Sequence, residues 1–160
     1  MYQEGLSLWF DTGALPARQA ARALLALNER TEARGLRLSE GQALELVAAR
    51  TEALAKTGRI EFGGGAIERL ILAFCDSPYL SRDHYAQSLR ELIDLFYEFK
   101  NETLDRISDQ ELVGFMAQAF DGPCAGSVDL LAGQALPALA RHLRDGKSFS
   151  SFLLRGEEWA

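Results

Sequence analysis

The chain has 160 residues, a formal net charge of −6, 48% hydrophobic residues and 25% charged residues. This length and composition are typical of one globular domain and exclude an intrinsically disordered chain. The negative charge disfavours a general electrostatic attraction to anionic lipid or to nucleic acid, so a nucleic-acid partner is not expected.

No membrane partner is predicted either, because no apolar run approaches the roughly 20 residues that span a bilayer. Residues 1–10 carry Glu4 and have no basic region before their apolar part, unlike a secretory signal. We therefore expect a cytoplasmic protein, in which Cys75 and Cys124 are reduced core thiols rather than a disulfide.

Residues 1–15 are predicted to form an N-terminal arm. Its apolar residues at 6–10 alternate, which indicates a short strand or an extended segment. A helix is predicted over residues 16–34, because proline suits a first helical turn and Gly35 suits a helix end. The pattern does not decide whether residues 6–10 pair with residues 59–62.

A second helix is predicted over residues 39–58. Ser39 and Gln42 have the spacing of a capping box, and Gly58 is suited to the C-terminal end. The apolar spacing predicts an inner face formed by Leu44, Val47, Thr51 and Leu54.

Residues 59–62 alternate between charged and apolar types, so they could form a short strand. Three glycines at 63–65 then break the chain. A further helix is predicted over residues 66–75, and Pro78 indicates a turn.

The longest periodic stretch, residues 81–107, predicts a central helix. Its apolar face is formed by Tyr85, Leu89, Leu92, Ile93, Phe96, Phe99, Leu104 and Ile107. The opposite side carries acidic residues that we call the acidic stripe: Glu91, Asp94, Glu98, Glu102 and Asp105. Carboxylates at i, i+3 could bind Mg²⁺, but a stripe opposite the apolar face should face water, so no metal site is predicted.

Two more helices are predicted over residues 108–121 and 127–146. Ser108 and Glu111 form a second capping box, and the last helix is interrupted at 133–137 by glycine and proline. Together these elements predict an all-α (mostly α) single-domain orthogonal bundle of about six helices over residues 16–146. It contains at most one short two-stranded β element.

One candidate site lies at the start of the helix predicted over residues 66–75. Free amides at a helix N-terminus attract anions, and a guanidinium adds charge-assisted hydrogen bonds. The anion-binding candidates are Arg59, Gly63, Gly64 and Gly65, for a phosphate or nucleotide-type ligand and, with Mg²⁺, a phosphohydrolase. The alternative is a sharp turn that only glycine can adopt, since the P-loop spacing is absent.

A second candidate is the C-terminal tail, residues 147–160. Its large apolar side chains are costly to expose, so they dock on the bundle, on a second copy or on another protein. The interaction candidates are Phe149, Phe152, Leu153 and Trp159. Because no catalytic spacing is found, we predict no catalytic residue and no cofactor. A non-enzymatic protein-interaction or adaptor domain is the first hypothesis.

Four stretches also carry a family resemblance: 58–65 (GRIEFGGG), 70–79 (LILAFCDSPY), 96–103 (FYEFKNET) and 120–124 (FDGPC). They resemble a family of small bacterial proteins described only as a domain of unknown function, found mainly in Gram-positive anaerobes. The resemblance covers roughly residues 24–144. It implies a bacterial, cytosolic protein, and it supplies no activity, ligand or site residue.

Overall fold

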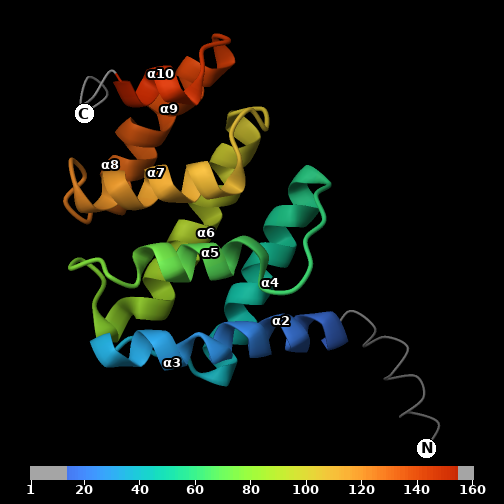
Figure 1. Ribbon diagram of the computed structural model, residues 1–160. Coiled ribbons are helices and arrows are strands. Elements are labelled where there is room, and N and C mark those ends of the chain that lie inside the picture. Colours follow the sequence, from blue (N-terminus) through green and yellow to red (C-terminus); the bar gives the residue numbers. More distant parts are fainter. Residues whose placement is uncertain (1–13, 155–160) are drawn as a thin grey trace, which may run out of the picture.

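The computed structural model describes residues 14–154, which fold into a bundle of helices (Figure 1). No strand occurs among these residues, so the all-α prediction is confirmed. The helices are α2 (Ala14–Ala26), α3 (Asn28–Thr31), α4 (Glu40–Thr57), α5 (Gly65–Phe74), α6 (Tyr85–Glu102), α7 (Asp109–Asp121), α8 (Val128–Leu130), α9 (Leu136–Arg144) and α10 (Phe149–Leu154).

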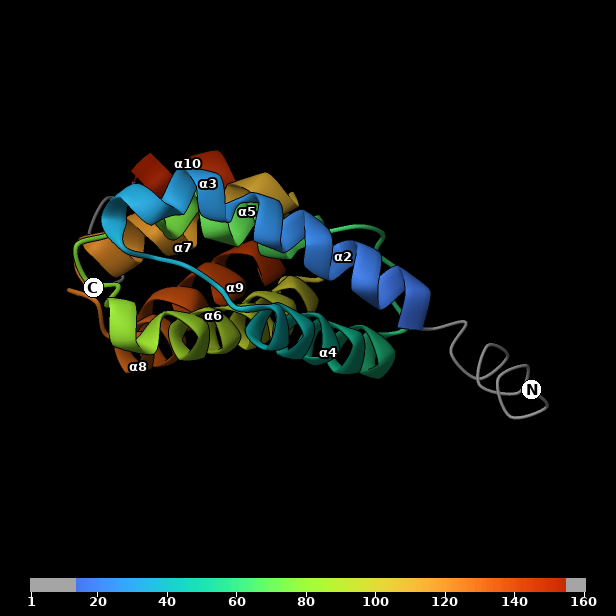
Figure 2. The same cartoon turned by 90° about the horizontal axis from the view of Figure 1, so that it is seen from below.

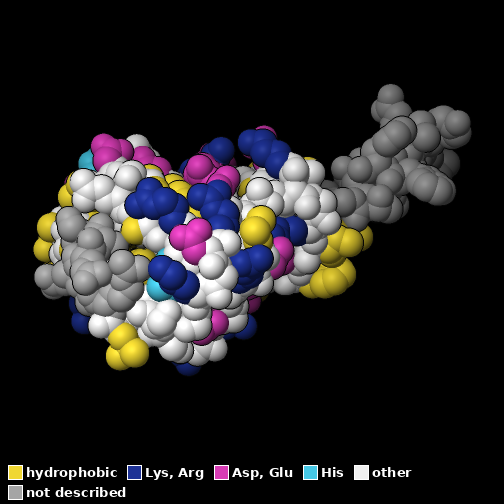
Figure 3. Space-filling model, turned by 90° about the horizontal axis from the view of Figure 1, so that it is seen from above, with side chains coloured by type: hydrophobic (Ala, Val, Ile, Leu, Met, Phe, Trp, Pro, Cys, Tyr) yellow, Lys and Arg dark blue, Asp and Glu magenta, His cyan; other side chains and the backbone are white. Residues whose placement is uncertain are grey.

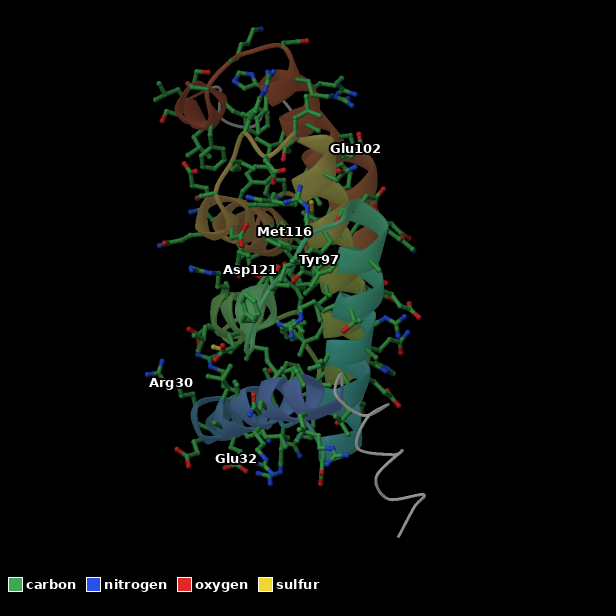
Figure 4. All side chains as sticks on the ribbon, turned by 90° about the vertical axis from the view of Figure 1, so that its right-hand side faces the viewer. Arg30, Glu32, Tyr97, Glu102, Met116 and Asp121 are labelled. Carbon is green, nitrogen blue, oxygen red and sulfur yellow. The ribbon has the colours of Figure 1, made fainter. Side chains whose placement is uncertain are left out.

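The helices form two layers that cross each other. Figure 2 shows α2, α3, α5, α7 and α10 in one layer and α4, α6, α8 and α9 in the other. Seen from the side, α2, α5 and α7 are stacked, and α4 and α6 run along this stack (Figure 4). Each layer covers the apolar face of the other, which is the packing expected of an orthogonal bundle.

The core lies between the layers and is centred on α6. Leu89, Leu92, Ile93 and Phe96 of this helix are fully buried, and they pack in one cluster with apolar side chains of both layers. Their spacing is the i, i+3, i+4, i+7 pattern of the sequence, so periodicity located the central helix correctly.

Both ends of the central helix differ from the predicted range of 81–107. Residues Arg82–His84 form a 3-10 turn, and α6 ends at Glu102. Leu104 and Asp105 have φ angles of 56° and 58°, a left-handed conformation that a right-handed helix cannot include. Ile107 is nevertheless buried, because the turn returns it to the core.

Local side-chain signals fix several other helix ends as predicted. Ser39 with Gln42 and Ser108 with Glu111 form complete capping boxes, and the Ser127 hydroxyl accepts a hydrogen bond from the Leu130 amide. Gly35 and Gly58 adopt left-handed conformations at helix ends, with φ angles of 75° and 68°. The predicted interruption near Pro137 is a π-helical turn, Leu131–Ala135, between α8 and α9.

Some predictions fall on residues outside the described range of 14–154. They include the arm up to residue 13, with its apolar residues at 6–10, and Trp159 of the tail. None of the helices within residues 14–154 combines the length and the apolar content that a membrane span requires.

Candidate functional site

The connection between α4 and α5 presents two large apolar side chains to solvent. It runs down the right-hand side of the molecule in Figure 1, and residues 59–62 form no strand there. Ile60 is 79% exposed and Phe62 is 85% exposed. The alternating charged residues, Arg59 and Glu61, form hydrogen bonds with the helical bundle. The alternation in the sequence therefore separates an anchored charged side from an exposed apolar side. We call this stretch the 59–62 segment.

Arg59 anchors the first end of the segment to the turn after α6. Its two terminal nitrogens donate hydrogen bonds of 2.6 and 2.7 Å to the two carboxylate oxygens of Asp105. This hydrogen-bonded pair raises the pKa of Arg59 and lowers the pKa of Asp105. The left-handed backbone at Asp105 thus aims its carboxylate at the guanidinium, and it leaves the neighbouring Leu104 side chain 57% exposed.

Glu61 anchors the other end of the segment to both layers. Its Oε2 accepts a hydrogen bond of 2.6 Å from the Tyr97 hydroxyl of α6, and its Oε1 accepts one of 3.0 Å from the Ala66 amide. Figure 4 labels Tyr97, which is buried on α6. Burial, followed by the bond to the Glu61 carboxylate, raises the pKa of this tyrosine. Glu61 therefore supplies an acceptor for a free amide in the first turn of α5, whose N-cap residue is Gly64.

A buried arginine of α4 lies next to Glu61. Arg50 is only 5% exposed, its Nη1 donates a hydrogen bond of 2.7 Å to the Gly63 carbonyl, and the same nitrogen is 3.9 Å from Glu61 Oε1. Among the described residues, Arg50 Nε is buried without a hydrogen-bond partner, and so is Arg59 Nε. A buried unpaired donor costs about 1–3 kcal/mol, so both nitrogens favour an additional acceptor.

A surface hollow of about 510 Å³ lies between α2, α4 and the 59–62 segment. We call it the α2–α4 hollow. Its lining combines both arginines with apolar side chains: Pro16, Ala17, Gln19, Val47, Arg50, Thr51, Leu54, Ala55, Arg59, Ile60, Glu61, Phe62 and Gly63. Its volume is in the range of small-ligand pockets, and its lining includes the two exposed apolar side chains of the segment.

The glycines of the anion-binding prediction lie at the start of α5. Gly63 and Gly65 have φ angles of 61° and 52°, and a Cβ at Gly65 would overlap Glu61 Oε1. The Ala66 amide already holds the Glu61 carboxylate, so the chain itself supplies an anion at this helix N-terminus. Arg59 is likewise bound to Asp105. Anion binding by the candidate residues stays a prediction, and the unpaired arginine nitrogens support it best.

The described part of the C-terminal tail packs on α7 and α9. Phe152 is 3% exposed and makes edge-to-face contacts with Phe115 and with the His142 ring, at centroid distances of 5.5 and 5.1 Å. Phe149 contacts Phe115 in the same way. Leu153 is 48% exposed, so it is the interaction candidate of α10 that remains on the surface.

The acidic stripe faces mainly outward. Its members are exposed except for the half-buried Glu102. Three of them lie in ion pairs, Asp94 with Arg90, Glu102 with Arg144 and Asp105 with Arg59. Within residues 14–154, no group of three or more His, Cys, Asp or Glu side chains is placed to bind a metal ion. Acidic and basic side chains are also interspersed on the face seen in Figure 3.

Comparison with known proteins places the chain in a family. The profile of a family of unknown function (DUF6323) matches residues 23–149. The chain belongs to this family. The match contains α4 to α9, and with them the 59–62 segment, Arg50 and Asp105. A search of curated proteins and a search of solved structures each found no match.

The match confirms the family resemblance found in the sequence. It adds no activity or ligand, and the bacterial origin and cytoplasmic location implied by the resemblance stay predictions.

Sequence reasoning missed Arg50, Glu61 and Tyr97 as parts of this site. Arginine in the middle of an apparently amphipathic helix is usually a surface residue, and nothing local to Arg50 indicates burial. The alternation of charged and apolar residues over 59–62 was the one signal that could have indicated Glu61. A carboxylate that points inward on such a segment needs hydrogen-bond partners in the bundle.

Replacing Asp105 by asparagine should flatten the acid limb of the curve of stability against pH. Because Arg59 lowers the pKa of Asp105 in the folded state, the pair stabilises the fold above the ordinary carboxyl pKa of 3.8. That contribution is lost as the pH falls through the folded-state pKa. The Asp105 side chain is 55% exposed, so we expect a loss of about 0.5 kcal/mol at neutral pH.

Thermal unfolding of wild type and Asp105→Asn between about pH 2 and pH 7 measures this effect. The two curves should converge at the acid end. Asp83→Asn, at an exposed position, is the matched control and should run parallel to wild type. Parallel curves for Asp105→Asn would show that the pair contributes nothing to stability.

Proposed function

We propose that this chain is a non-enzymatic protein-interaction domain of a bacterial cytosolic protein, with a contact surface centred on Ile60 and Phe62. The observation that carries the proposal is their exposure, 79% and 85%, on a segment held at both ends by Arg59 and Glu61.

The energetics favour a binding role for these two side chains. Burying a large apolar side chain contributes about 1.5–3 kcal/mol, and this free energy is unused while Ile60 and Phe62 face water. The anchored charges reduce the ordering cost on binding, because the segment is already held in place. Pre-positioned aromatic and aliphatic side chains of this kind are typical of the residues that dominate interface energetics.

Photo-cross-linking in cells of the native host tests the proposal. A benzophenone amino acid at position 62 should give discrete cross-linked products, because a contacting partner lies within reach of the side chain. Adding the Ile60→Ser substitution should lower the yield of these cross-linked products roughly 30-fold, which is the effect of losing a dominant interface residue. Urea unfolding of Ile60→Ser should stay within about 0.5 kcal/mol of wild type, since the side chain is exposed.

The matched control places the same amino acid at Leu44, an exposed leucine of α4. If positions 44 and 62 give the same products with the same yield, the surface around Phe62 is not a specific contact site. If position 153 on α10 alone gives discrete products, the tail carries the interaction and the proposed surface is wrong.

A second candidate is binding of a small anion, which the two unpaired arginine nitrogens support. Both arginines line the α2–α4 hollow, which adjoins the proposed contact surface.

A further inference from the structure

We infer that the α2–α4 hollow binds a carboxylate of the partner together with a bulky apolar side chain next to it. The ligand is thus a peptide segment that carries both groups, and the inference rests on the proposed interaction function. It specifies which chemistry the partner presents to this surface.

The charge of the lining favours an anion. Among the residues that line the hollow, Arg50 and Arg59 are basic and Glu61 is acidic, whereas the whole chain has a net charge of −6. The Arg59 guanidinium is already paired with Asp105, so the charge available to a ligand is mainly that of Arg50. Arg50 is only 5% exposed, and its buried Nε has no hydrogen-bond partner among the described residues. A ligand carboxylate can accept charge-assisted hydrogen bonds from this guanidinium, which within residues 14–154 donates to the Gly63 carbonyl and lies beside the Glu61 carboxylate.

The remaining lining favours an apolar group beside that anion. Val47, Leu54 and Ala55 of α4 line the hollow together with Pro16 and Ala17 of α2. A volume of about 510 Å³ accommodates one large side chain and the backbone on either side of it. The exposed Ile60 and Phe62 extend the apolar contact beyond the hollow, and so a peptide uses this surface more completely than an isolated ion.

The same residues discriminate against phosphate. The Ala66 amide at the start of α5 is bound to Glu61, so it does not supply the free helix N-terminus that phosphate sites use. Glu61 also lines the hollow, and its negative charge repels a dianion more strongly than it repels a carboxylate. A monoanionic carboxylate is therefore the better match for a lining in which Arg59 is already paired with Asp105 and Arg50 lies beside Glu61.

Titrations of the wild-type chain monitored by amide NMR test the inference. The probes are N-acetyl-phenylalanine, N-acetyl-phenylalanine amide, N-acetyl-aspartyl-phenylalanine amide and inorganic phosphate. The first and third probes present a terminal and a side-chain carboxylate, so their comparison identifies the source of the carboxylate. We expect at least one of them to bind with a millimolar Kd and to shift the amides of Ala17, Thr51 and Gly63.

The carboxylate probe that binds should do so at least about fivefold more tightly than N-acetyl-phenylalanine amide, because the amide lacks the charged acceptor. Arg50→Met should remove this preference, and the wild-type comparison stands even if that variant does not fold. Equal Kd values for carboxylate and amide probes, tighter binding of phosphate, or shifts confined to other helices would each overturn the inference.

The outcome is separable from that of the proposed function. If cross-linking at position 62 succeeds while the carboxylate preference is absent, the interaction surface is supported and the inferred partner chemistry is wrong. If the probes bind as expected while cross-linking fails, the hollow is a small-carboxylate site and the interaction function is wrong.

Discussion

Replacing Glu61 by alanine should lower the free energy of unfolding by about 3 kcal/mol. Three groups depend on this carboxylate: the Tyr97 hydroxyl at 2.6 Å, the Ala66 amide at 3.0 Å and the Arg50 guanidinium at 3.9 Å. The variant leaves a buried hydroxyl and a first-turn amide of α5 without their acceptor, and a buried arginine without its nearest negative charge. Urea unfolding measures the loss, and the melting temperature should fall by about 6–12 °C.

The matched control is Glu45→Ala, which removes an exposed carboxylate from the surface of α4 and should change stability by less than about 0.5 kcal/mol. Glu61→Gln should lie between the two, since its amide oxygen can still accept one hydrogen bond. A loss for Glu61→Ala as small as that for Glu45→Ala would show that the 59–62 segment is not held by this side chain. The pre-positioning argument for Ile60 and Phe62 would then fail.

The ends of several helices could be predicted because their signals are local. A serine hydroxyl that caps α4 or α7 meets its partner amide three residues along the chain, at Gln42 and Glu111. Gly35 and Gly58 end helices through their own φ angles. Such signals need no knowledge of the tertiary structure.

The end of α6 could not be predicted in the same way. Leu104 and Ile107 continue the apolar period of the helix, so the pattern gives no sign of the turn. The left-handed residues Leu104 and Asp105 are favoured by long-range contacts, and Arg59 binds Asp105 across 46 positions of the sequence. The prediction placed Arg59 in an anion site and Asp105 in the acidic stripe, whereas the two bind each other.

The inner face of α4 shows why the α2–α4 hollow was missed. Val47 and Leu54 are buried as predicted, but Leu44 is 36% exposed and Thr51 is exposed. The buried face is rotated so that it includes Arg50, which a hydrophobicity pattern assigns to the surface. Only the Gly63 carbonyl and Glu61, which lie after the end of the helix, explain the burial of this arginine.

Replacing Phe152 by alanine should lower the free energy of unfolding by about 3 kcal/mol and detach α10 from the bundle. Phe152 is 3% exposed and packs edge-to-face on Phe115 of α7 and on His142 of α9. It is thus the apolar anchor of a short helix, while His142 Nε2 lies 2.8 Å from both the Ser148 carbonyl and the Ser151 hydroxyl. Urea unfolding measures the global loss, and amide hydrogen exchange at Ser151 reports the detachment.

Leu153→Ala is the matched control, because this neighbour is 48% exposed and should change stability by less than about 0.5 kcal/mol. The contrast also separates two roles of the tail. If Phe152 is an anchor and Leu153 a surface contact, only Phe152→Ala changes exchange at Ser151. Equal effects of the two variants would mean that α10 docks through its exposed side chains, so Phe149 and Phe152 would again be candidates for binding a partner.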